Sequence, residues 1–180
     1  MYKYSSISLT FFTVLLFFIC SCQSNHPATE PEIVSTPEKM NETVSENVKE
    51  VLQYALENNG KINDTIKLQL PGILNTFYTE IDYKNIWSNK EVWEPLADSL
   101  YQFIENSEAY GLFPADYHFR YIKNLREQLA LDPSAKTDAT IWTKAELMLT
   151  DAFMQISKHL KQGRLLPDSI SLSADSTLAN

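Results

Sequence analysis

The strongest constraint on the fold is a long helical pattern, from about Asp138 to Gln162, that is apolar on two opposite sides. One broad stripe contains Ile141, Ala145, Met148, Leu149, Ala152, Phe153, Ile156 and Leu160. Leu147 and Met154 lie nearly opposite this stripe. A helix that is apolar on two sides has to be covered on both. This segment is therefore either the central helix of its own domain or a helix that leaves a second face for another domain.

Shorter patterns precede this segment. Apolar residues at steps of three and four predict helices near residues 44–57, 73–81, 93–110 and 115–131. Ile66, Leu68 and Leu70 alternate with polar residues and predict one short strand. The chain has only 4 Gly and is 44% hydrophobic, which favours a packed helical body over a turn-rich β-sandwich. We expect a mainly α fold: a compact bundle of about five helices with at most a short strand.

The N-terminus is typical of a bacterial lipoprotein signal. Lys3 is the only charge in the first 22 residues, and the apolar stretch 7–19 is too short to span a membrane. It ends in Ile19-Cys20-Ser21-Cys22, which is similar to a lipobox. We expect residues 1–21 to be removed and Cys22 to carry acyl chains, which would hold the protein on a membrane. An ordinary cleaved signal with two incidental cysteines remains the alternative.

The rest of the chain divides into three expected parts. Residues 22–46 contain the lipidated cysteine followed by a stretch with Pro27, Pro31 and Pro37 among Thr, Ser and Glu, which predicts a flexible, disordered tether. Residues 47–168 form the expected helical domain. Residues 169–180 are polar and have no closing element, so we expect them to lead to a missing domain. The expected location is the cell envelope, lipid-anchored at the periplasmic face of the outer membrane.

Charge and cysteine positions exclude several classes of function. A net charge of −8 provides no basic surface for nucleic acid. Both cysteines lie within the first 22 residues, so the later chain has no thiol nucleophile, disulfide or Cys-rich zinc site. His118 and His159 have no partners at metal-ligand spacing, so we expect no metal, no cofactor and no catalytic residue. An acid–base hydrolase is formally possible with 23 acidic residues, but no motif pairs two of them.

Three clusters carry a family resemblance. They are FYTEIDYKNIW at residues 77–87, GLFPADY at 111–117, and LMLTDAF at 147–153, which runs on towards Gly163. Together they resemble the helical scaffold domain that precedes the catalytic domain in large L,D-transpeptidases, envelope enzymes that form 3-3 cross-links in peptidoglycan. The resemblance covers roughly residues 47–168.

The resemblance implies a non-catalytic role for these residues. The catalytic domain of that family uses a cysteine in an S-H-G-C-x-R motif, and this sequence has neither the motif nor any cysteine after Cys22. The positions that carry the resemblance are expected to be structural: Phe77, Tyr78, Trp87, Gly111, Leu112, Pro114, Asp116, Tyr117, Thr150, Asp151 and Gly163.

Several of these side chains allow more specific expectations. Trp87 and Tyr117 are expected in the core rather than in a peptidoglycan groove. Asp151 is expected either to pair with a cation on another element or to cap a neighbouring backbone. Asp116 is four residues before Arg120, which predicts a local ion pair. His159 is expected at the edge of the core.

Two functions remain open at this stage. The first is the scaffold part of a membrane-anchored L,D-transpeptidase in cell wall biogenesis, with a catalytic domain as its partner. The second is a stand-alone envelope lipoprotein that binds peptidoglycan or a partner protein without chemistry. The two-sided last helix favours the first, because a stand-alone domain should not expose Leu147 and Met154.

Overall fold

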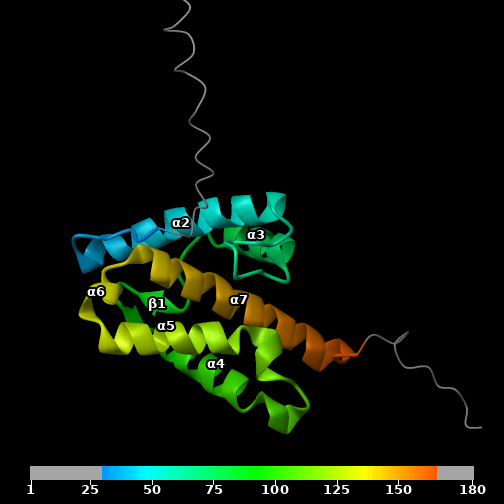
Figure 1. The fold of residues 1–180 in the computed structure, drawn as a ribbon. Helices are drawn as coiled ribbons and strands as arrows, with labels where there is room; N and C mark the ends of the chain where they lie inside the picture. The colour runs from blue at the N-terminus through cyan, green and yellow to red at the C-terminus, as the bar shows by residue number, and fades with distance from the viewer. Residues whose placement is uncertain (1–29, 166–180) are drawn as a thin grey trace, which may run out of the picture.

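The computed structural model describes residues 30–165. The helices are α2 (Pro37–Glu57), α3 (Pro71–Glu80), α4 (Pro95–Glu105), α5 (Phe119–Leu131), α6 (Pro133–Lys136) and α7 (Ala139–Gln162). Two 3-10 turns, η2 (Ser107–Tyr110) and η3 (Pro114–Tyr117), lie between α4 and α5. Strands β1 (Ser88–Asn89) and β2 (Val92–Trp93) form a short antiparallel hairpin. The expected mainly α fold is confirmed (Figure 1).

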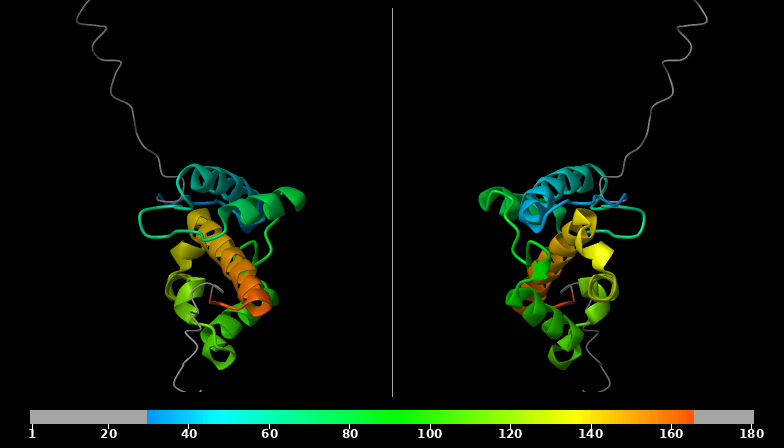
Figure 2. Two further views of the ribbon diagram at one scale, coloured as in Figure 1. Left: turned by 90° about the vertical axis from the view of Figure 1, so that its right-hand side faces the viewer. Right: turned by 90° about the vertical axis from the view of Figure 1, so that its left-hand side faces the viewer.

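Helix α7 runs through the middle of the domain. Helices α2 and α3 cover one side of it, and α4 and α5 lie on the other (Figures 1 and 2). Leu147 is fully buried and Met154 packs against the edge of the core. Both apolar sides of α7 are therefore covered within the domain, as in the first of the two alternatives, and the expectation that Leu147 and Met154 would be exposed without a second domain is wrong. Phe153 and Leu160 depart from the predicted stripe, with 45% and 57% of their surfaces exposed.

The folded body begins earlier than expected. Helix α2 starts at Pro37, a residue whose fixed φ suits the first turn, and Met40 and Val44 are fully buried. Before the helix, the Val34 amide donates to the Thr137 carbonyl at 2.8 Å. The prediction of a tether through residue 46 is therefore wrong for residues 30–46. The predicted signal, Cys22 and residues 169–180 lie outside the described residues.

The segment 66–70 forms no strand, and its Lys67 makes only an isolated antiparallel bridge with Lys61. Ile66 and Leu68 are buried, as the alternation predicted. However, the Leu68 amide donates back to the Gly60 carbonyl at 2.8 Å, and the next two amides donate to a side chain of α7. Among residues 30–165 this pairing does not extend beyond a single bridge, so the predicted strand is wrong and the segment is a loop.

The boundaries of the remaining helices follow proline, glycine and capping residues. Pro95 occupies the first turn of α4, as expected. His118 adopts φ 57° and separates η3 from α5, where a single helix was predicted. Helix α6 was not predicted; Asp132 caps it by accepting from the Ser134 amide at 2.9 Å. Within residues 30–165, no helix combines the length and the apolar character that crossing a membrane requires.

Gly60 allows a direct test of the turn after α2. We expect Gly60→Ala to lower the free energy of unfolding by about 2 kcal/mol. The residue has φ +86°, and an added Cβ would collide with the Leu68 carbonyl oxygen. Urea denaturation followed by circular dichroism measures the effect.

Gly72 provides the matched control. An added Cβ at this position in α3 meets nothing within 4 Å. Gly72→Ala should therefore be neutral, or stabilising by up to about 1 kcal/mol through helix propensity. Equal effects of the two substitutions would contradict the assigned role of Gly60.

Candidate functional site

The middle of α7 carries three polar side chains that are almost completely buried. Glu146, Thr150 and Asp151 are each at most 1% exposed. Glu146 and Thr150 lie four residues apart and share one side of the helix, and Asp151, the next residue, points about 100° further round. We call them the α7 polar cluster. Buried polar groups need partners, and the partners of this cluster come from distant parts of the chain.

Glu146 binds the segment that leads into the β1–β2 hairpin. Its carboxylate accepts the Ile86 amide at 2.7 Å and the Trp87 amide at 3.2 Å. The Tyr78 hydroxyl donates to the same group at 3.1 Å. Burial raises the pKa of the Glu146 carboxyl to about 7, although the three donors act in the opposite direction. This side chain therefore fixes the start of the hairpin to the centre of α7.

Thr150 joins two aromatic side chains to the cluster. Its hydroxyl lies 2.6 Å from the Tyr78 hydroxyl, accepts from Trp87 Nε1 at 2.7 Å, and donates to the Glu146 carbonyl at 2.9 Å. Burial, together with the nearby Glu146 carboxylate, raises the pKa of Tyr78 well above its usual value. Tyr78 and Trp87 are buried with their polar atoms satisfied, so Trp87 belongs to the core and not to a groove.

Asp151 organises a different loop. Its carboxylate accepts the Gln69 amide at 3.0 Å and the Leu70 amide at 2.9 Å, at the start of α3. His118 Nε2 lies 2.7 Å from Oδ2 of the same carboxylate. The backbone-capping interpretation of Asp151 is confirmed, and the carboxylate also has a histidine partner. Sequence reasoning missed that partner, because no spacing rule connects residues 33 positions apart.

The GLFPADY segment attaches to the end of α7. The Tyr117 hydroxyl lies 2.8 Å from His159 Nδ1, and Tyr117 is fully buried. Arg164 Nε donates to Asp116 at 2.6 Å. The predicted Asp116–Arg120 pair is wrong, because the left-handed residue His118 interrupts the helical spacing and Arg120 lies over the Tyr121 ring.

The remaining positions of the resemblance shape the ends of elements. Phe77 packs edge-on against Tyr78, and Leu112 is buried. Gly111 closes η2 in the left-handed conformation, and Pro114 opens η3. Gly163 follows the last residue of α7.

The arrangement holds loops in place and presents no reacting group to solvent. Glu146, Thr150 and Asp151 are buried. Their side-chain oxygens already accept hydrogen bonds from backbone amides and neighbouring side chains. In the described part of the chain, no group of three or more His, Cys, Asp or Glu side chains could hold a metal ion.

A family model described as a scaffold domain matches residues 72–179. The chain belongs to the scaffold-domain family. All three sequence clusters lie within the scaffold-domain match, as do the α7 polar cluster and its partners Tyr78, Trp87 and His118. Helix α2 precedes the match but packs against α7 in the same core. Comparisons with curated proteins and with solved structures found no match.

Glu146 predicts a pH dependence of stability. The pKa of its carboxyl rises from an ordinary 4.5 to about 7 in the folded protein. Its contribution to stability is therefore complete below pH 4.5 and is lost as the pH rises through 7. Glu146→Gln cannot titrate. The stability advantage of the wild type over this variant should shrink by about 2 kcal/mol between pH 5 and pH 7.5.

Urea denaturation at both pH values measures this difference. Glu50 lies exposed on α2, so Glu50→Gln should leave the pH dependence of the wild type unchanged. A constant gap between the wild type and Glu146→Gln would mean that Glu146 titrates as an exposed carboxyl does.

Asp151 predicts a local loss of protection. In Asp151→Asn, an amide group replaces one acceptor oxygen and faces donors from Gln69, Leu70 and His118. We expect a loss of about 3 kcal/mol of stability. The Gln69 and Leu70 amides should also exchange hydrogen faster. Asp64→Asn, in an exposed loop, should change neither measurement. Unchanged exchange at residues 69 and 70 would refute the capping role.

Proposed function

We propose that this protein is the non-catalytic scaffold part of a membrane-anchored L,D-transpeptidase system that cross-links peptidoglycan in cell wall biogenesis. In this role it supports and orients a catalytic cysteine domain that lies outside these 180 residues. The observation that carries the proposal is the scaffold-domain match over residues 72–179, on the clusters that resemble L,D-transpeptidases.

The buried network supports a positioning role. A support for another domain needs a fixed shape, and Glu146 and Asp151 attach two loops to the central helix through buried hydrogen bonds. The sequence also has no cysteine after Cys22 to act as a nucleophile.

Anchoring belongs to the same proposal. Acylation at Cys22 would hold the domain at the cell envelope, on the periplasmic face of the outer membrane, close to the wall. The partners would then be the lipid bilayer and either peptidoglycan or the transpeptidase catalytic domain.

One observation favours the second candidate, a stand-alone envelope lipoprotein that binds peptidoglycan or a partner protein. Leu147 and Met154 are covered by the domain itself, so α7 does not require another domain to cover it. The two candidates differ in whether the protein works with a transpeptidase.

The test compares the cross-links of the wall with and without the protein. Deletion of its gene should lower the fraction of 3-3 cross-linked muropeptides, and the wild-type gene should restore it. Cys22→Ser should restore it poorly, because the unanchored protein is released from the membrane. Gly72→Ala serves as a folded control and should restore it fully.

The two candidates predict different outcomes. An unchanged 3-3 fraction after deletion would refute the transpeptidase role and favour the binding lipoprotein. The intact mass of the native protein, extracted from envelopes with detergent, provides a second criterion. A mass equal to residues 22–180 plus acyl chains would favour the binding lipoprotein, and a mass larger by a whole domain would favour the transpeptidase scaffold. In either case, an N-terminal peptide without acyl chains on Cys22 would refute lipidation.

A further inference from the structure

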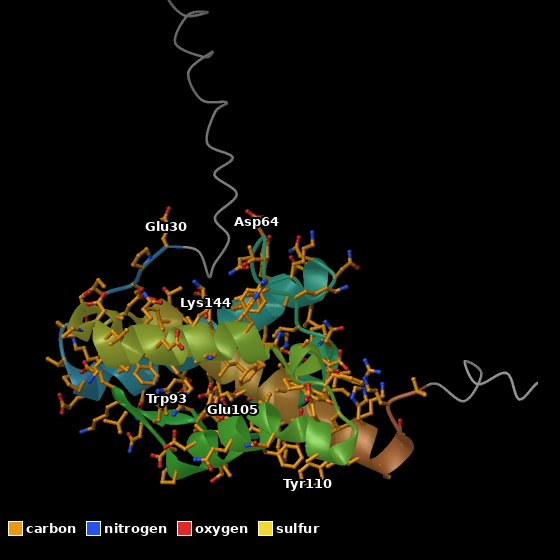
Figure 3. The ribbon with its side chains drawn as sticks, turned by 60° about the horizontal axis from the view of Figure 1, so that its bottom comes forward. Glu30, Asp64, Trp93, Glu105, Tyr110 and Lys144 are labelled. Atoms are coloured by element: carbon orange, nitrogen blue, oxygen red, sulfur yellow. The ribbon has the colours of Figure 1, made fainter. Side chains whose placement is uncertain are left out.

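An open cleft with aromatic walls lies where α4, α5 and the β1–β2 hairpin meet. Its volume is about 600 Å³, within the range of about 300–1,000 Å³ that small-molecule sites occupy. Trp93, Tyr101 and Trp142 line it, and Figure 3 shows Trp93 on this face of the domain. We call it the aromatic cleft.

Arg126 holds the aromatic rings of the cleft in place. Its guanidinium lies 4.7 Å from the Tyr101 ring centre and 5.1 Å from that of Trp93. Trp93 in turn packs against Trp142, with ring centres 5.0 Å apart. Arg126 Nη2 donates to Asp98 at 2.5 Å, which fixes the side chain from the other end. The walls are therefore set before any ligand arrives, which lowers the entropic cost of binding.

One donor in the cleft is unused. Arg126 Nη1 is buried and has no acceptor among residues 30–165. A buried N–H without an acceptor is unfavourable. A ligand oxygen that enters between the rings, with a small shift of a ring edge, would supply the missing acceptor. Side-chain adjustments of this size are common on binding.

The charges of the cleft are balanced. Its charged lining residues are Glu91, Asp98, Glu127, Lys123, Arg126 and Lys136. The whole chain has a net charge of −8, so neither the cleft nor the protein attracts an anion. Carboxylates accept hydrogen bonds and cationic side chains donate them, whereas a hydroxyl does both. This mixture therefore suits a neutral ligand that carries many hydroxyl groups.

We propose that the aromatic cleft is a carbohydrate-binding site. The flat C–H face of a sugar ring packs on the part of Trp93 that remains exposed. Tyr101, which lies between Arg126 and Phe119, offers its edge and hydroxyl. The sugar hydroxyls pair with the charged side chains at the mouth. An N-acetyl group adds a carbonyl acceptor of the kind that Arg126 Nη1 lacks. The identification of the carbohydrate with the glycan strands of peptidoglycan rests on the proposed function, whereas the preference for a neutral sugar rests on the cleft alone.

The test measures binding of a neutral, peptide-free glycan to the full chain. Chitotriose is titrated into the protein in a detergent without a sugar headgroup, and tryptophan fluorescence is followed. The chain has 3 tryptophans, and two of them, Trp93 and Trp142, line the cleft. Their fluorescence therefore reports on a ligand that binds there. We expect a saturable change. A stem peptide without sugar, titrated in the same way, should produce none.

Two variants locate the site. Trp93→Ala should weaken chitotriose binding about tenfold or more, as expected for the loss of a stacking ring. Lys123→Ala combined with Glu127→Ala keeps the net charge and changes only exposed residues, so the fold should be unaffected. This double variant should weaken binding about threefold or more. Tyr110→Ala, which removes an aromatic ring that is 62% exposed outside the cleft, is the matched control and should bind normally.

The outcomes separate this inference from the proposed function. No saturable change with chitotriose, binding of the peptide alone, or normal binding by both cleft variants would overturn the carbohydrate site. If the site fails in this way while gene deletion still lowers the 3-3 cross-link fraction, only the cleft assignment is wrong. If chitotriose binds at the cleft while cross-links are unchanged, the protein binds glycan without serving a transpeptidase.

Discussion

The fold depends on two buried carboxylates in one helix. The loops before α3 and before the hairpin have little regular structure, so their backbone amides need acceptors from elsewhere. Asp151 accepts the Gln69 and Leu70 amides, and Glu146 accepts those of Ile86 and Trp87. Both loops are thus attached to α7 by hydrogen bonds to buried carboxyl oxygens, which satisfy amides that would otherwise lack a partner. Helix α7 thus supplies side-chain acceptors to two loops and also forms the centre of the hydrophobic core.

This arrangement favours geometric precision over maximal stability. Burial of a carboxylate is costly, and the raised pKa of Glu146 reflects that cost. An apolar residue at the same position would fill the space but would leave the Ile86 and Trp87 amides without acceptors. The polar cluster therefore defines one arrangement of the loops, which is the property that a supporting domain needs.

The sequence predicted the elements well and their connections poorly. Helices at 71–80, 95–105 and 139–162 were predictable because apolar periodicity and proline or glycine boundaries agree there. The first turns of α2, before residue 44, were missed because polar residues surround Met40. The Asp151 contacts join loops about 80 residues away, and no local rule encodes them. Asp116 pairs with Arg164, since a positive φ at His118 breaks the spacing that predicted Arg120.

The buried cluster and the aromatic cleft are connected through the hairpin. The Trp87 amide is bound by Glu146, and the Trp87 carbonyl accepts the Glu94 amide at 2.9 Å. The hairpin between these two residues ends at Trp93, which forms one wall of the cleft. Trp142, which packs against Trp93, lies one turn before Glu146 on the same helix. The side chain that fixes the loop to α7 therefore also helps to place Trp93 against Trp142. The cleft therefore keeps its shape through two contacts: Glu146 holds the start of the hairpin against α7, and Arg126 holds Trp93 and Tyr101 between α4 and α5.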